Sequence, residues 1–381
     1  MCLTRSAVLG LLLAAASSGA VAGVAPAPST TGLGPTNVVA GDFGAPRVIV
    51  TEAYPGHRHL GWPKLVSDGG DNLAVGFVGA KEHFKGAGQT GVAVSSDGGR
   101  TFSAPVYQRD SNSRRCPHTA NLVMGAAAGR FFLLNMAYDG GSESIVVGRT
   151  SDDFGRTWKL ADTTLITSNR TGSVFGHVID AGGGRLAVFG HRRPKGEPAG
   201  GIWMSLSNDR GASWGEAKDV LPGKGLVEPD FVCVRGGFVG LVRQNGVDGY
   251  WQVRLNEAGD LTDGPTLVLG DGVRGHGFPS PCLVADPKDP DRLYLLRSRR
   301  FTFFGNRPND GEIDLWTASA KKLDWRRLGT VVTIRGVQDF GYPAFAPTKD
   351  GAWLAVFYAG KNKGNSDIYA VSVPQDRMRV K

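Results

Sequence analysis

Three features that would point to other kinds of protein are scarce or absent in this chain of 381 residues. No long stretch has the apolar periodicity of a helix, which argues against a mainly helical fold. No run of basic residues and no recognisable nucleic-acid-binding motif is present, which excludes the usual readers of DNA and RNA. Only four cysteines occur, and their spacings match no metal site.

The first 22 residues have the pattern of a cleavable signal peptide: Arg5, a short apolar core, and small residues at Ala20–Ala22. The apolar run is too short to span a membrane. We therefore expect a secreted or periplasmic protein without membrane insertion, in which residues 23–34 form a disordered linker. Three cysteines remain after cleavage, an odd number that leaves at least one free thiol; we expect all three to be small buried residues.

Basic residues outnumber acidic ones, giving a net charge of +8. In a secreted protein this excess favours an anionic partner. With nucleic acid excluded, an acidic glycan or polysaccharide is the partner that fits.

Glycine is abundant, with 56 residues, and a short pattern rich in turn-forming residues recurs. The stretches SSDGGRTF, SDDFGRTW and SNDRGASW begin at Ser95, Ser151 and Ser207, and both intervals are 56 residues. A fixed period of this size indicates an array of supersecondary units. Serine and aspartate cap tight turns through their side chains, and glycine permits the backbone conformation that such turns need. We therefore interpret each pattern as a turn between the third and fourth strands of a unit, and Asp97 as a turn residue and not a catalytic acid.

Six hairpin patterns recur at intervals of about 50–60 residues, and they begin near residues 59, 117, 175, 227, 278 and 341. Six units of four antiparallel strands predict an all-β, six-bladed β-propeller that fills residues 35–381 as one domain. Pro46–Val50 is predicted to supply the outer strand of the last blade, and we expect a monomer. Two stacked β-sandwiches are the alternative, but the equal spacing argues against them.

The repeated Asp-containing turns on six units resemble the Asp-box (BNR) repeats of the sialidase superfamily. That resemblance covers nearly the whole chain after the signal segment. It implies a tyrosine nucleophile assisted by a glutamate, because the substrate carries a carboxylate at its anomeric carbon and would repel a carboxylate nucleophile. Tyr342 in GYPAF and Glu228 in VEPDF stand at the family's positions.

The resemblance also implies three arginines that hold the substrate carboxylate, a task suited to planar guanidinium groups. Arg243 matches the second. The third comes from the fifth blade, where the possibilities are Arg297, Arg299, Arg300 and Arg307. The family's first arginine is replaced by Gly61, and Arg58 is the nearest substitute.

The family's acid/base aspartate is missing, because the loop GAKEHFKGAGQTG contains none. Glu82 or His83 could take its role. Histidines also stand at or near the start of several hairpins, and we predict that they line a polar substrate-binding pocket: His59, His118, His177 and His276. No tight ligand spacing supports a metal, and no cofactor is predicted.

Three functions remain open from the sequence. The first is a sialidase-like exo-glycosidase acting on a terminal acidic sugar, either sialic acid or a related ulosonic acid. The second is a polysaccharide lyase that acts on uronic-acid chains through His177 or His191, Tyr342 and Arg243. The third is a glycan-binding propeller without activity, in which Trp62 and Trp251 act as sugar platforms.

Overall fold

The computed structural model describes residues 31–34, 36–51, 55–83, 88–108, 114–139, 143–168, 173–192, 200–301 and 309–378. The signal segment, residues 23–30 of the predicted linker, and Arg307 therefore lie outside the described residues. The described residues contain no helix with the length and apolar character of a membrane span. Helical structure within them is confined to α1 (Thr164–Ser168) and the 3₁₀ segment η2 (Gln375–Met378).

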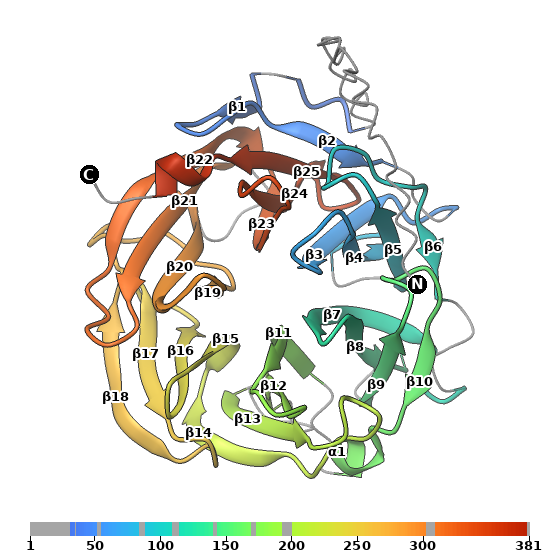
Figure 1. Cartoon of the computed structure of the whole chain (residues 1–381). Coiled ribbons are helices and arrows are strands. Elements are labelled where there is room, and N and C mark those ends of the chain that lie inside the picture. Colours follow the sequence, from blue (N-terminus) through green and yellow to red (C-terminus); the bar gives the residue numbers. More distant parts are fainter. Residues whose placement is uncertain are drawn as a thin grey trace, which may run out of the picture.

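The described chain is otherwise built from antiparallel sheets that follow one another around a common centre (Figure 1). Three sheets have four strands each: β7 (His118–Ala127), β8 (Arg130–Tyr138), β9 (Ser144–Ser151) and β10 (Lys159–Ala161); β11 (Ser173–Asp180), β12 (Leu186–His191), β13 (Gly200–Ser207) and β14 (Lys218–Lys224); β15 (Leu226–Val234), β16 (Gly237–Gln244), β17 (Tyr250–Leu255) and β18 (Leu261–Val268).

The other two sheets include strands from both ends of the chain. One contains β19 (Cys282–Asp286), β20 (Asp289–Arg300), β21 (Asn309–Ser319), β22 (Arg326–Val337) and, at its outer edge, β1 (Val38–Ala40). The other contains β23 (Asp339–Pro347), β24 (Trp353–Asn362), β25 (Asn365–Val373), β2 (Arg47–Val50), β3 (His59–Ser67), β4 (Leu73–Ala80), β5 (Gln89–Ser95) and β6 (Val106–Tyr107).

The N-terminal strands complete sheets formed by the C-terminal part of the chain. Strand β2 pairs antiparallel with β25, which confirms the prediction for Pro46–Val50. Strand β1 pairs with β22, a contact that the sequence did not indicate. A single parallel pair, Ser366 with His59, joins β25 to β3.

Neighbouring sheets pack face to face, and this packing forms the core. Val78 of β4 and Leu122 of β7 belong to one buried cluster, and Val123 of β7 and Val188 of β12 belong to the next. Because each sheet is covered on both faces, its inner strands are apolar on both sides; all eight residues of β4 are buried. Cys116, Cys233 and Cys282 form no disulfide, and Cys233 is only partly buried, whereas we expected all three to be buried.

The three repeated turns lie between β5 and β6, β9 and β10, and β13 and β14, at the outer side of the sheets (Figure 1). In the first, the Ser95 hydroxyl accepts the Gly99 N–H at 2.9 Å and donates to Asp97 Oδ1 at 2.7 Å. Asp97 also accepts the Thr101 hydroxyl at 2.6 Å. The second and third turns repeat these bonds at Asp153 and Asp209.

We expect Asp97→Asn to lower the free energy of unfolding by about 1–2 kcal/mol, because an amide replaces a carboxylate that accepts several hydrogen bonds. The turn is remote from the centre, so turnover per folded molecule stays unchanged. Urea denaturation followed by an activity assay on the folded fraction checks both parts. Abolished turnover in a fully folded variant would show that this turn is not merely structural.

Candidate functional site

The innermost strands carry β-bulges where they begin, and these bulges present side chains to the centre of the ring. The pairing register shifts between Gly61 and Lys64 in β3, between Val227 and Asp230 in β15, and between Gly341 and Ala344 in β23. A bulge leaves a residue unpaired and redirects its side chain.

The residues at these bulges have an unusual backbone conformation. Trp62, Glu228 and Tyr342 have φ angles of 51°, 50° and 48°, in the left-handed region. Each is followed by a proline, which cannot donate to a sheet and is tolerated at a bulge. Non-glycine residues held in this region cost about 1–3 kcal/mol each and are concentrated at functional sites.

Two of these residues, Glu228 and Tyr342, are hydrogen-bonded across the centre. The Tyr342 hydroxyl donates to Glu228 Oε1 at 2.9 Å. Arg243 Nη1 donates to Glu228 Oε2 at 2.5 Å, and the Ser280 backbone N–H donates to the same oxygen at 3.1 Å. The structure thus brings Tyr342 and Arg243 to Glu228, although in the sequence they stand 114 and 15 residues away from it.

The electrostatics of this group fix its protonation states at neutral pH. Burial tends to raise the pKa of Glu228, but the charge of Arg243 and hydrogen bonds from Arg243 and Tyr342 outweigh it and hold the pKa below its usual range. Burial and the Glu228 charge both raise the pKa of Tyr342. The phenol is therefore protonated and hydrogen-bonded to an ionised carboxylate, which can accept its proton.

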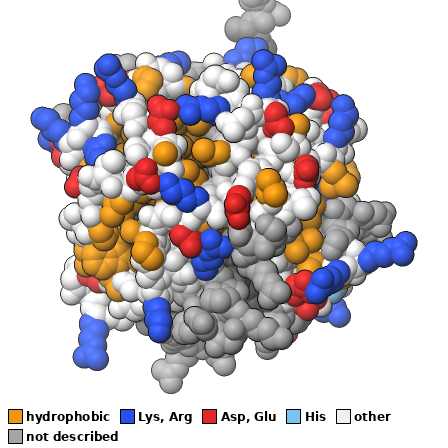
Figure 2. Space-filling view, turned by 90° about the horizontal axis from the view of Figure 1, so that it is seen from below, with side chains coloured by type: hydrophobic (Ala, Val, Ile, Leu, Met, Phe, Trp, Pro, Cys, Tyr) orange, Lys and Arg blue, Asp and Glu red, His pale blue; other side chains and the backbone are white. Residues whose placement is uncertain are grey.

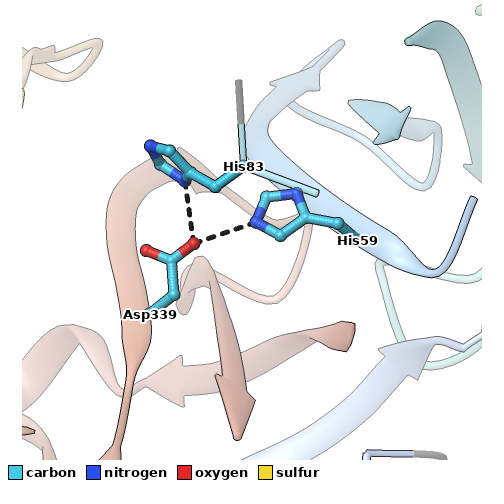
Figure 3. Close-up of side chains that lie close together, drawn as sticks. All are labelled: His59, His83 and Asp339. Carbon is cyan, nitrogen blue, oxygen red and sulfur yellow. Dashed lines mark hydrogen bonds and ion pairs between the residues drawn. The ribbon is translucent and has the colours of Figure 1, made fainter. Parts of the chain in front are cut away.

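A second group is centred on Asp339, the first residue of β23 (Figure 3). Its Oδ2 contacts His59 Nε2 at 2.9 Å and His83 Nδ1 at 2.8 Å. Its Oδ1 accepts the Tyr358 hydroxyl at 2.8 Å and lies 3.3 Å from Arg300 Nη2. Burial tends to raise the pKa of Asp339, but hydrogen bonds from the two histidines and the charges of His83 and Arg300 hold it well below the ordinary value.

His83 is oriented by this carboxylate. Because the ionised Asp339 accepts a hydrogen bond from His83 Nδ1, the hydrogen of the neutral imidazole is on Nδ1 and the lone pair is on Nε2. Burial lowers the pKa of His83 below 6.5, while the hydrogen bond to Asp339 partly offsets this effect. His83 therefore takes up its second proton, at Nε2, at a lower pH than an ordinary histidine does.

The groups around Tyr342 and Asp339 border the same space. The ring centroid of Trp62 lies 4.8 Å from that of His83 and 6.2 Å from that of Tyr342. The Tyr358 ring lies 6.2 Å from Tyr342. The charge of Arg300 also acts on the Tyr342 phenol.

Sheet pairing distinguishes the arginines of the fifth unit. Gly277 pairs with Arg300 across its hairpin as Val227 pairs with Arg243 in the preceding one. Arg300 therefore reaches the centre beside Tyr342. Arg299 instead pairs with Asp271 and Glu312, and Arg297 pairs with Asp314.

Among the described residues, no arginine replaces the one that the family has at the start of β3. A Cβ atom on Gly61 would lie 2.5 Å from His59 Cε1, so the His59 ring occupies the space that a longer side chain would need. Arg58 and Glu82 are exposed, and no described contact links the side chain of Arg58 to the site.

The predicted histidines are divided among separate places. His59 joins the Asp339 group, whereas the His118 ring packs against Tyr138. His177 contacts Asp230 at 2.9 Å beside a cavity of about 400 Å³ that also contains Lys64 and extends along the strands away from Glu228. His276 contacts Asp271 at 2.7 Å. The single shared pocket predicted for all four histidines is therefore not observed among the described residues.

Asp339 and Tyr358 were not recognised from the sequence. Asp339 stands three residues before Tyr342, and only the fold shows that two histidines face it. His59, His83 and Asp339 are also the one group of three potential metal ligands found among the described residues, with ligand atoms within 4.8 Å of one another. Their hydrogen bonds to one another, with Arg300 and Tyr358 on the second oxygen, satisfy the carboxylate without an ion.

No known family model matches the chain, and no curated protein matches it in sequence. Solved structures match its fold. A protein of unknown function from Dyadobacter fermentans is 16% identical with a TM-score of 0.61, and the match covers 88% of this chain and 99% of that one. A Hadza microbial sialidase is 16% identical with a TM-score of 0.62, covering 86% and 68%. The NanB sialidase of Streptococcus pneumoniae is 11% identical with a TM-score of 0.62, covering 88% and 71%. The chain therefore has a sialidase-like fold.

We expect Asp339→Asn to destabilise the protein by about 3–5 kcal/mol, because it breaks a buried charged network and leaves Arg300 without its anionic partner. The pKa of Asp339 is lower in the folded protein than in the unfolded chain, where it is about 4. The ionised carboxylate therefore contributes stability above that pH, and the contribution is lost as the pH falls through the lower pKa of the folded state. The variant should therefore lose less stability than the wild type between neutral pH and pH ~3.

Thermal and urea unfolding over this pH range measure both effects. Asp263→Asn is the matched control, because Asp263 is 72% exposed and its nearest cation lies 3.9 Å away. It should change the free energy of unfolding by less than about 0.5 kcal/mol. Equal acid sensitivity of Asp339→Asn and the wild type would contradict the assignment.

Proposed function

We propose that the protein is a sialidase-like exo-glycosidase that hydrolyses a terminal acidic sugar, either sialic acid or a related ulosonic acid. The observation that carries this proposal is the buried Tyr342–Glu228 hydrogen bond with Arg243 on the other carboxylate oxygen. A tyrosine activated by a carboxylate suits an anomeric carbon that itself bears a carboxylate. The sialidase-like fold supports it at the level of architecture.

We also infer that the sheets form a closed six-bladed propeller, with the eight-stranded sheet counted as two blades joined at Ser366 and His59. The signal pattern in residues 1–22 is our basis for proposing that the protein is exported and meets its substrate outside the cytoplasm.

In the first step, the Tyr342 oxygen attacks the anomeric carbon while the phenol proton passes to Glu228. The bond between that carbon and the leaving oxygen breaks, and protonated His83 gives its Nε2 proton to the leaving oxygen. Arg243 and Arg300, whose charges both act on the phenol, hold the sugar carboxylate. In the second step, His83 takes a proton from water, which attacks the same carbon; Tyr342 leaves and recovers its proton from Glu228.

Elimination is the competing chemistry at the same residues. A neutral His83 with its hydrogen on Nδ1 could also remove the C5 proton of a uronic acid through Nε2, with Tyr342 protonating the leaving oxygen. Assays with a sialoside and with uronic-acid polymers separate the two. Free sugar without new ultraviolet absorbance means hydrolysis, whereas the absorbance of an unsaturated product means elimination. Glycan binding with neither signal leaves a binding protein.

We expect Tyr342→Phe to reduce sialoside hydrolysis to background, because the variant keeps the ring but loses the attacking oxygen. Glu228→Gln should lower kcat/KM by about 10²–10⁴-fold through loss of the proton acceptor. Circular dichroism and release of 4-methylumbelliferone from its sialoside measure folding and turnover. Tyr294→Phe is the control, because that hydroxyl is bound to Asp286 at 3.2 Å, away from the candidate site. Full activity in Tyr342→Phe would exclude the nucleophile assignment.

The pH dependence tests His83 separately. Because the imidazolium must donate a proton, kcat/KM for a sialyl oligosaccharide should rise as the pH falls below 6.5 and decline again when Glu228 is protonated. His83→Ala should lower this activity by about 10²–10⁴-fold. The same variant should lose much less activity on an aryl sialoside, because the leaving group of that substrate needs no proton. Equal losses on both substrates would show that His83 is not the acid.

A further inference from the structure

A groove of about 420 Å³ begins at Arg243 and runs outward between the fourth and fifth units. It lies at the end of the sheets where Glu228 and Tyr342 face the centre, since Arg243 bonds directly to Glu228. The side chains and loops that line it include the following residues: Arg243, Gln244, Asp248, Arg274, His276 and Phe278.

Acidic side chains connect the loops of this groove through hydrogen bonds. Asp248 accepts the backbone N–H groups of Asp271 at 3.0 Å and Gly272 at 2.7 Å. Asp271 in turn accepts the Val273 N–H at 2.9 Å and contacts His276 Nδ1 at 2.7 Å. The groove wall is therefore preorganised, which lowers the entropic cost of binding a ligand.

Arg299 anchors this wall from the sheet beneath it. Its Nη1 lies 2.8 Å from Asp271 Oδ2, and its Nη2 contacts Glu312. Its guanidinium also lies 5.1 Å from the centroid of the Phe301 ring, on which His276 stacks. Arg299 and His276, both predicted to bind substrate directly, thus build the groove beside the catalytic pair.

The carboxylates of the wall are occupied by these contacts. Burial tends to raise the pKa of Asp271, but hydrogen bonds from His276, Arg299 and the Val273 backbone hold it at about 2. Arg274, by contrast, is exposed and makes no hydrogen bond or ion pair in the part of the chain that the structure describes. Within the described residues, the groove therefore offers one lining cation, Arg274, whose charge is uncompensated.

The chemistry of the proposed substrate determines which part of it can enter the groove. In an ulosonic acid, the carboxylate and the leaving oxygen are attached to the same carbon. If Arg243 holds that carboxylate, the sugar attached through the leaving oxygen starts beside Arg243. A groove that begins at Arg243 is thus suited to the leaving sugar.

We propose that this groove binds the leaving sugar and that Arg274 selects a leaving sugar that carries a negative charge. The preferred substrate is then an oligomer in which one acidic sugar is linked to another. This inference rests on the proposed function, because that function places the substrate carboxylate at Arg243.

The test compares three substrates: an α-linked dimer of sialic acid, sialyl-lactose with its neutral leaving sugar, and an aryl sialoside. Arg274→Ala should lower kcat/KM for the dimer about 10-fold relative to that for sialyl-lactose, through loss of a charge-assisted contact. Arg274→Lys should restore part of the preference. Added salt should weaken it in the wild type, because the groove is open to solvent.

The matched control is Arg235→Ala. Arg235 is exposed in the turn between β15 and β16, at the opposite end of the hairpin that carries Arg243. Its substitution therefore removes one positive charge at a site away from the groove. This variant should keep the wild-type ratio between the two oligosaccharides.

The outcomes separate the two proposals. If the wild type hydrolyses sialosides and Arg274→Ala keeps the wild-type ratio, the groove assignment is wrong and the proposed function stands. If the wild type hydrolyses no sialoside, the proposed function is wrong. Calorimetric titration with the intact dimer then tests the groove assignment. Weaker binding to Arg274→Ala than to Arg235→Ala supports the assignment, and equal or absent binding overturns it.

Discussion

The backbone bulge at the start of the inner strands is the constraint on which the candidate site depends. A regular strand would alternate its side chains between the two faces of the sheet and would bury Glu228 and Tyr342 against a neighbouring sheet. The left-handed conformation before a proline instead turns both side chains toward the centre. The sheets, packed face to face over large apolar clusters, supply the stability that holds this strained geometry.

Charge compensation then decides which groups are free to act. Glu228 is paired with Arg243, and Asp339 with Arg300 and two histidines, so each buried anion has its own cation. Such pairs contribute little net stability, because the desolvation of both partners offsets their attraction. Their effect is on reactivity: they keep Glu228 and Asp339 ionised beside a protonated phenol and a titratable imidazole. Outside the centre, Lys and Arg are interspersed with Asp and Glu on the face shown in Figure 2, without a single basic patch.

The sequence predicted the parts of the structure that depend on repetition. The 56-residue period located the turns, and the hairpin pattern placed Tyr342 and Glu228 at equivalent positions of different units, with Arg243 at the end of the Glu228 hairpin. It could not predict contacts that depend on the exact course of a loop or on the pairing across a hairpin. Arg299 and Arg300 are neighbours in the sequence, yet strand alternation sends one to Asp271 and the other to Asp339. Likewise, the four histidines appeared equivalent, although only His59 faces the candidate catalytic group. Asp339 was missed because it lies just before the recognised pattern and its partners come from the other end of the chain.

The attachment of β1 and β2 to β22 and β25 has a consequence for the order of events during synthesis. These partners lie roughly 300 residues apart in the chain, so the N-terminal strands must wait for nearly the last segment to emerge. Closing so long a loop is entropically costly, and topologies dominated by such distant pairings fold slowly. The nascent polypeptide thus cannot complete these two sheets until translation is almost finished.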